Sequence, residues 1–193
     1  MNMRPASGVS LFFACAAVMG TGCAAPGVDF SKIHRPSRAS ELDAYDIFVG
    51  DWTWEAEALN ADPAHKKWTG AARWEWALDR RCLHGQMSLK SADTEFQTAG
   101  VWTWHPLKKE HIWTMFNNWG YPQSGTARYN PSRRHWMMTY SAVGLDGTSS
   151  YGVYDMTVVD NDHLRWSLTE WADPLHFVKK LEMSGTYTRT KQP

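Results

Sequence analysis

The chain has 193 residues, 43% of them hydrophobic and 21% charged, which suits one globular domain with a sizeable core. Lys and Arg together number 20, as do Asp and Glu, so the formal net charge is zero. This balance, without a basic stripe, argues against nucleic acid or an anionic lipid surface as a partner.

The N-terminal segment, residues 1–22, is expected to be a secretory signal peptide. Arg4 is its only charged residue, and residues 9–19 are apolar or small but too few to span a membrane as a permanent helix. The chain is therefore expected to be exported to the periplasm.

The end of this segment, Gly20-Thr21-Gly22-Cys23, resembles a bacterial lipobox, in which the cysteine becomes the lipidated first residue of the mature protein. Thr21 and Gly22 fit the pattern, whereas Gly20 stands where a leucine is usual. Two outcomes stay open, which are lipidation at Cys23 and ordinary cleavage after Ala25. The first would make the chain an outer-membrane lipoprotein that contacts the membrane through the lipid at Cys23.

Proline, glycine, serine and arginine are frequent in residues 23–39, a composition typical of a tether. The folded body is expected over residues 40–193 and begins with a short helix. Ser40 is expected to cap this helix, with Asp43 as the acid of a capping box, and Gly50 is expected to end it. Its buried face would consist of Leu42, Tyr45, Phe48 and Val49.

From Gly50 onward the hydrophobic period is two, which is typical of β-strands. The 12 tryptophans all follow Gly50, and three pairs are spaced two residues apart, so both rings of a pair face the same side of a sheet. These pairs are Trp52 with Trp54, Trp74 with Trp76, and Trp102 with Trp104. About ten strands are predicted, over residues 50–59, 66–78, 81–90, 94–104, 110–117, 123–129, 134–143, 149–159, 163–171 and 179–189.

Short turns between these strands, such as Asp146-Gly147, imply antiparallel pairing of neighbours. A long meander leaves two unpaired edges unless it closes on itself. We therefore predict an all-β fold, an up-and-down antiparallel barrel of about ten strands, with one short N-terminal helix and an aromatic inner face.

The first predicted strand opens with Gly50-Asp51-Trp52, which resembles the Gly-x-Trp signature of the lipocalin-like (calycin) superfamily. The resemblance implies a barrel like those of lipocalins and fatty-acid-binding proteins. It also implies that Trp52 plugs the closed end and that Arg189, on the last strand, lies across it. The span 42–189 is similar to an uncharacterised bacterial family of secreted lipocalin-like proteins, and the matching stretches are 48–52, 76–83, 105–109 and 185–189.

No sequence pattern indicates a cofactor or a metal ion. In small haem-binding barrels of similar shape an axial histidine lies on the final strand, but residues 179–189 contain none, and His176 is expected in the preceding loop. The eight histidines lack local metal-ligand spacing and are expected at surface or hairpin positions, with non-local assembly inside the barrel left open. Cys82, the single cysteine of the folded body, is expected to be a small buried hydrophobe.

No catalytic residue is predicted, which makes an enzyme the weaker class. Alternation places Glu55 and Glu57 on the outer face of the first strand, and Arg189 is the only clearly ionisable residue assigned to the inner face. An acid–base pair would need further ionisable groups inside the barrel.

The barrel interior is expected either to be nearly filled by rings or to hold a slim or flat apolar molecule. The loop 119–122 would form an aromatic rim at the open end. We predict an envelope-located binding protein for a small hydrophobic or aromatic molecule; the alternatives are a barrel isomerase or hydrolase acting on a similar molecule, and a structural envelope protein with a filled core. The residues predicted to contact the bound molecule are Trp54, Trp74, Trp76, Trp102, Phe116, Tyr140, Trp166 and Met183.

Overall fold

The chain divides into two compact units, Met1–Pro36 and Ser37–Pro193. The computed structural model describes residues 29–144 and 147–190. The described part of the first unit contains one turn of 3-10 helix, η1 (Phe30–Lys32). The signal-peptide and lipidation predictions, Cys23 included, lie outside the described residues. Within the described ranges, no helix has the length and apolar character needed to cross a membrane.

Ten antiparallel strands form a closed barrel in which each strand pairs with its neighbours in the sequence and β1 also pairs with β10. Every predicted strand agrees with the observed one to within one residue at each end, so the predicted barrel is confirmed. The strands are β1 (Gly50–Ala58), β2 (Lys67–Ala77), β3 (Cys82–Ser91), β4 (Thr94–His105), β5 (Glu110–Asn117), β6 (Pro122–Asn130), β7 (His135–Val143), β8 (Ser149–Val158), β9 (His163–Trp171) and β10 (Lys179–Arg189).

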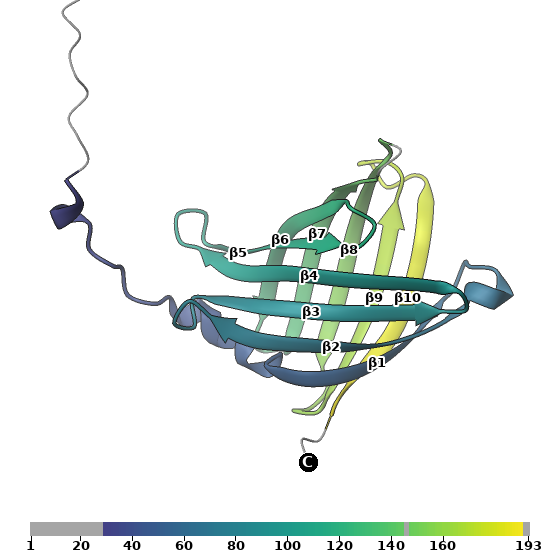
Figure 1. The fold of residues 1–193 in the computed structure, drawn as a ribbon, viewed down its shortest axis with the longest axis horizontal. Coiled ribbons are helices and arrows are strands. Elements are labelled where there is room, and N and C mark those ends of the chain that lie inside the picture. The colour runs from purple at the N-terminus through teal and green to yellow at the C-terminus, as the bar shows by residue number, and fades with distance from the viewer. Residues whose placement is uncertain (1–28, 145–146, 191–193) are drawn as a thin grey trace, which may run out of the picture. The chain divides into compact units, whose positions relative to one another are not determined.

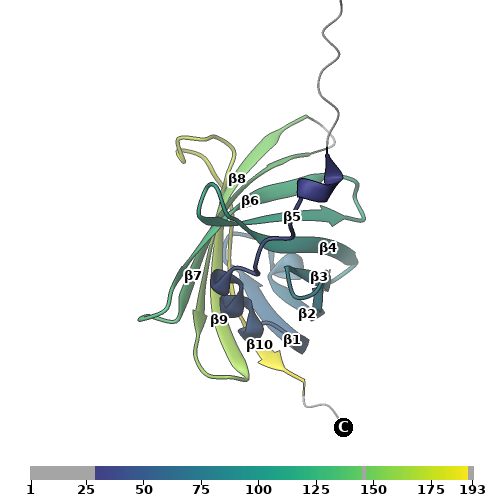
Figure 2. The ribbon, with the colours of Figure 1, turned by 90° about the vertical axis from the view of Figure 1, so that its left-hand side faces the viewer.

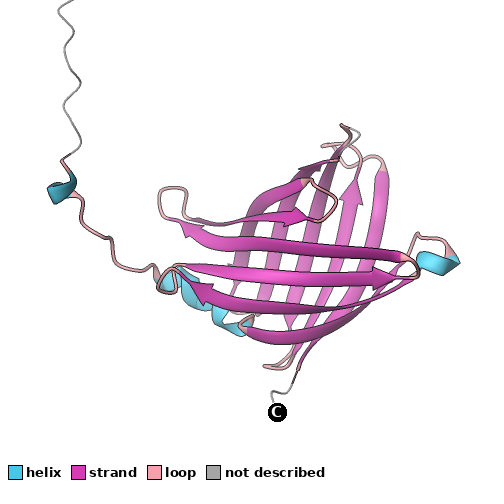
Figure 3. Ribbon diagram, in the orientation of Figure 1, coloured by secondary structure: helices cyan, strands magenta, loops and turns pink. Residues whose placement is uncertain are grey.

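The barrel wall has two differently oriented parts. Figure 1 shows β2, β3 and β4 running across the front, while β7 to β10 rise steeply behind them. Strongly tilted strands are what closure of a sheet into a barrel requires. Strands make up nearly all of the wall (Figure 3).

The predicted N-terminal helix is present as the 3-10 helix η2 (Ser40–Ile47), but its predicted cap is wrong. Ala39 is the N-cap residue, and no side chain caps the helix. With Ala39 as the N-cap, Asp43 lies one residue beyond the position of a capping-box acid, and its carboxylate accepts a hydrogen bond from the Arg38 guanidinium. Of the predicted buried face, Leu42, Tyr45 and Phe48 are buried, whereas Val49 is half-buried.

A third 3-10 turn, η3 (Pro63–His65), lies in the loop between β1 and β2 and was not predicted. The carboxylate of Asp62 accepts hydrogen bonds from the backbone N–H groups of Ala64 and His65, at 2.9 and 3.3 Å. Asp62 is therefore the N-cap of this turn.

At one end of the barrel, the closed end, Arg189 lies against Trp52, the two residues predicted to form a plug. The Arg189 guanidinium lies 4.2 Å from the centre of the buried Trp52 ring, which permits cation–π attraction. Arg189 also donates hydrogen bonds to the backbone oxygens of Ile47, at 2.8 Å, and Val49. Gly50 has a φ of +126°, and a Cβ there would lie 2.7 Å from Arg189 Nη1, so only glycine suits this position.

Helix η2 supplies a second layer over the same end, which faces the viewer in Figure 2. The Tyr45 ring stacks on Trp136 with centroids 5.1 Å apart, and Phe48 contacts both Trp136 and Trp74. The indole N–H of Trp52 donates to the backbone oxygen of Phe48 at 2.7 Å. The helix is therefore attached to the barrel by aromatic packing and by hydrogen bonds from barrel side chains to backbone oxygens at its C-terminal end.

Candidate functional site

The barrel encloses a cavity of about 330 Å³, so its interior is not solid. Tyr45 of η2 and Phe48, which directly follows this helix, lie at the closed end of the cavity. The walls come from all ten strands. Aromatic and thioether side chains dominate these walls. The tryptophans that line the cavity are Trp54, Trp68, Trp74, Trp102, Trp113, Trp136 and Trp166.

Glycines explain how so many rings leave space between them. Trp74 lies opposite Gly85 in the β2–β3 register, and a Cβ on Gly85 would come within 2.3 Å of the Trp74 ring. In the same way, a Cβ on Gly152 would lie 2.1 Å from the ring of Tyr140, its partner across β7 and β8. Both of these rings therefore lie over a glycine of the neighbouring strand, which leaves room at the centre of the barrel.

Most of the residues predicted to contact a bound molecule come together around this cavity. Its lining includes Trp54, Trp74, Trp102, Tyr140, Trp166 and Met183. Strand alternation placed these side chains on the inner face, because successive side chains in a strand point to opposite sides. Binding by these residues stays a prediction.

Trp76 was also predicted to contact the bound molecule, but it does not line the cavity. Its indole N–H donates to the Asp46 carboxylate at 2.8 Å, and the guanidinium groups of Arg38 and Arg80 lie 5.1 and 4.9 Å from its ring. Tyr45 of η2 packs against Trp76 with ring centres 6.3 Å apart. Trp76 is therefore on the face of β2 that the alternation predicts, but helix η2 lies between its ring and the cavity.

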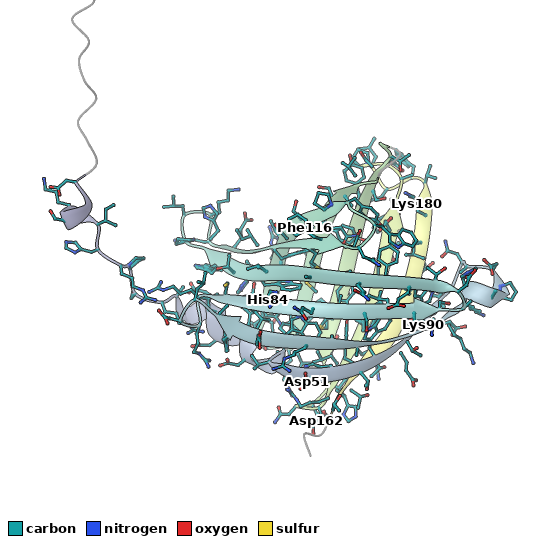
Figure 4. The ribbon with its side chains drawn as sticks, viewed as in Figure 1. Asp51, His84, Lys90, Phe116, Asp162 and Lys180 are labelled. Atoms are coloured by element: carbon teal, nitrogen blue, oxygen red, sulfur yellow. The ribbon has the colours of Figure 1, made fainter. Side chains whose placement is uncertain are left out.

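Phe116 is the second residue that lies outside the cavity, because the inner face of β5 was assigned wrongly. Its side chain is 61% exposed near the end of β5 (Figure 4), whereas the neighbouring Met115 lines the cavity. Strand β5 carries apolar residues on both faces, so its alternation does not distinguish them. The burial of His111 and Trp113 shows that the odd-numbered positions point inward.

Glu170 is a cavity residue that the sequence reasoning missed. Its Oε2 atom accepts a hydrogen bond of 2.6 Å from the Tyr140 hydroxyl. Tyr140, Gly152 and Glu170 are register partners across β7, β8 and β9. Because Gly152 between them has no side chain, the Tyr140 ring can extend over it and reach the Glu170 carboxylate. The alternation of Leu164, Trp166 and Leu168 was the available signal, because Glu170 is the next inward position of β9.

Among the cavity-lining residues, Glu170 is the only one with a charged side chain, and none is Lys, Arg or His. Burial raises the pKa of the Tyr140 hydroxyl, and the nearby Glu170 raises it further. The pKa of Tyr121 is also raised by burial and by Glu170. Arg189, the ionisable residue predicted on the inner face and across Trp52, lies against Trp52 at the closed end and does not line the cavity.

The polar groups of the cavity gather toward the open end. Asn117 ends β5, Gln123 is the second residue of β6, and Glu170 lies near the end of β9, and all three line the cavity. The predicted aromatic rim is divided: Tyr121 lines the cavity, while the half-exposed Trp119 contacts Phe96 with ring centres 4.0 Å apart. The cavity is therefore apolar in its depth and polar on one side of its mouth.

No model of a known protein family matches the chain, and no curated protein matches its sequence. Solved structures that share its fold include the following two. Rv2717c from M. tuberculosis is 11% identical, with a TM-score of 0.58 over 80% of this chain and all of that one. The S-type phycobiliprotein lyase CPES from Guillardia theta is 9% identical, with a TM-score of 0.51 over 81% of this chain and 96% of that one.

These similarities establish a lipocalin-like barrel fold. At such low identity they carry no information about which molecule this chain binds.

The closed end contains titratable groups that face away from the cavity mouth. His111, expected at the surface or in a hairpin, is buried, and burial lowers its pKa to about 4. Its Nδ1 atom is 3.0 Å from the Tyr45 hydroxyl, whose pKa burial raises. An uncharged imidazole packed between aromatic rings serves the structure of this end rather than proton transfer in the cavity.

The donor set around the cavity does not suit a metal ion or haem iron. No group of three or more His, Cys, Asp or Glu side chains able to hold a metal occurs within residues 29–144 and 147–190. His176 stacks on Trp171 in the β9–β10 loop with ring centres 4.0 Å apart and does not line the cavity. Cys82 is buried, as expected, and burial raises its thiol pKa.

Proposed function

We propose that the chain is a binding protein that holds a small hydrophobic or aromatic molecule inside the barrel. The observation that carries this proposal is the cavity of about 330 Å³ with its aromatic lining. Sites for small molecules are typically concave, mostly apolar and about 300–1,000 Å³ in volume, with few polar groups to orient the ligand. A flat ligand would gain both apolar burial and ring stacking against this lining.

The cellular location is part of the proposal. We propose that the chain is exported and anchored to the outer membrane by lipid at Cys23, as a secreted lipocalin-like protein of the bacterial family that it resembles. A Cys23→Ala variant should then leave the membrane fraction and appear in the soluble periplasmic fraction. A wild-type protein found only in the soluble fraction, and cleaved after Ala25, would contradict the anchor but not the binding role.

Native mass spectrometry of the protein purified from its own envelope tests the binding role directly. A reproducible bound mass that is lost on denaturation is expected. Titration with an apolar fluorescent probe should quench the intrinsic tryptophan emission, since seven tryptophans line the cavity.

A pair of variants makes this test specific to the cavity. Trp102→Ala, in the lining, should weaken probe binding by about tenfold or more, as expected when a stacking surface is lost. Phe116→Ala, on the exposed outer face of β5, should leave binding unchanged. Absence of both a bound mass and a probe response would refute the proposal.

A barrel enzyme is the second candidate, and the Tyr140–Glu170 hydrogen bond of 2.6 Å favours it. Two ionisable groups meeting inside the cavity are the minimum for acid–base chemistry. One of the fold neighbours is named a lyase, so the fold is compatible with an enzyme. Conversion of a bound molecule that Glu170→Gln abolishes without loss of binding would identify catalysis. The third hypothesis, a structural protein with a filled core, is opposed by the cavity itself.

A further inference from the structure

The charge of the cavity is unbalanced. Glu170 brings a carboxylate into a lining that contains no basic side chain. The ion pairs formed within the described residues do not include Glu170, although Lys, Arg and His pair with other acids at many surface positions. A carboxylate that is partly removed from water and lacks a counter-ion costs free energy. A folded protein keeps such a group more readily when it has a function.

Tyr140 holds this carboxylate in a defined position. Its hydroxyl donates its single proton to Oε2 of Glu170, and the other carboxylate oxygen, Oε1, has no hydrogen-bond partner within the described residues. The ring of Tyr140 is in turn held over Gly152 and against Trp113, with ring centres 5.6 Å apart. One oxygen of a positioned carboxylate is therefore available to a group in the cavity.

Aromatic faces surround the same region. Tyr121 and Tyr140 lie near enough to Glu170 for its charge to raise the pKa of both phenols. Trp113 and Trp102, stacked at an interplanar angle of 18°, continue the aromatic wall from Tyr140. Ring faces attract cations and repel anions, and a carboxylate does the same. Both features therefore favour the same sign of charge in a bound molecule.

Building on the proposed binding function, we infer that the cavity selects a small apolar or aromatic molecule that carries a positively charged nitrogen, an organic ammonium ion. Glu170 accepts a charge-assisted hydrogen bond from the ammonium group near the cavity mouth. The apolar part of the molecule lies deeper, between Trp74 and Trp102. Tyr140 is a positioning residue that acts through Glu170.

Three probes with one shared ring system and different charge test this inference by isothermal titration calorimetry at pH 7. They are 1-naphthylmethylamine, which is a cation at this pH, the neutral 1-naphthylmethanol, and the anion 1-naphthoate. We expect the amine to bind at least about tenfold more tightly than the alcohol, which corresponds to about 1.4 kcal/mol, and the anion to bind most weakly.

Variants assign the preference to one carboxylate. Glu170→Gln keeps the shape of the side chain and should reduce amine affinity to that of the alcohol while leaving alcohol affinity unchanged. Glu55→Gln, on the exposed outer face of β1, is the matched control and should change neither affinity. Tyr140→Phe should weaken amine binding by less than Glu170→Gln does, since the carboxylate remains.

The possible failures are distinguishable. Equal affinity for amine and alcohol, or tighter binding of the alcohol or the anion, would overturn the inference and leave the binding function standing. A preference for the amine that survives in Glu170→Gln would overturn the role of Glu170. Absence of binding by all three probes would count against the binding function itself. The ranking of probes on the wild-type protein decides the charge preference even where a variant fails to fold.

Discussion

The closed end and the cavity half of this barrel contain the same types of aromatic residue, but these fill the closed end and line an open space in the cavity half. At the closed end, rings meet other rings: Tyr45 stacks on Trp136, and Trp52 lies under Arg189. In the cavity half, rings also contact rings, as Trp102 and Trp113 do, but some lie over glycines, as Trp74 does over Gly85. A tryptophan therefore either closes the end of the barrel or lines the cavity, depending on which residues of the neighbouring strand or helix lie against its ring.

Charge separates the two regions as well. The cation of the closed end, Arg189, is satisfied by backbone oxygens and by Asp162, whose carboxylate lies 3.4 Å from its Nε. The anion of the cavity half, Glu170, has only a phenol as its partner within the described residues. The first region is consequently arranged for stability, and the second keeps a capacity for interaction.

The largest expected effect is on stability at the closed end. Trp52→Ala should lower the free energy of unfolding by about 3–5 kcal/mol, because the buried ring leaves a cavity under Arg189. Trp102→Ala, in the half-buried cavity wall, should cost less than half of that value and mainly weaken binding. Urea unfolding followed by circular dichroism gives both values, and equal losses would remove the distinction between the two regions.

A methyl group at Gly152 should damage the cavity half selectively. Gly152→Ala places a Cβ 2.1 Å from the Tyr140 ring, so the ring must move and its bond to Glu170 must break. We expect a loss of about 1–3 kcal/mol in unfolding free energy, typical of overpacking. Combining it with Tyr140→Ala should cost less than the sum of the single variants, since the clash is gone. Additive losses would show that the ring does not rest on Gly152.

Acid should weaken the closed end through His111. Its pKa is about 4 in the folded chain against 6.5 for an exposed histidine, so the unfolded chain binds more protons between these values. Stability should therefore fall as the pH falls from about 6.5 to 4, by at most about 3 kcal/mol in total.

The variant His111→Gln should flatten this part of the pH profile in urea titrations, while His84→Gln, at a half-exposed position on β3, should leave it unchanged. Carboxylates with lowered pKa values, such as Asp160, affect stability only at lower pH. An unchanged slope in His111→Gln would show that another group causes the acid loss.

The smallest expected effect is that of replacing one cation by another at the plug. Arg189→Lys keeps the charge but loses the flat guanidinium that stacks on Trp52 and donates hydrogen bonds to three backbone oxygens. A loss of about 1 kcal/mol is expected. Arg165→Lys, on the exposed face of β9, should change stability by less than half of that amount. Equal effects at both positions would mean that the stack contributes nothing measurable.

Much of the candidate site could be predicted from the sequence, and the misses have identifiable causes. Alternation correctly placed Trp54, Trp74 and Trp166 in the interior, since it depends only on the backbone geometry of a strand. Phe116 was assigned wrongly because β5 is apolar on both faces. Glu170 was missed although its alternation with Trp166 points inward, because a lone acid was not expected among the rings.

The sequence by itself determined the ten strands, their boundaries and the closure of the barrel. Period-two hydrophobicity and turn residues are local signals, and a meander of this length must close to satisfy its edges. Only the tertiary structure decided that η2 covers Trp76, that the rings rest on glycines and leave a cavity, and that Tyr140 reaches Glu170 across β8. The reason is that these contacts depend on the exact register between paired strands and on how η2 packs against the barrel, which the alternation within one strand does not specify.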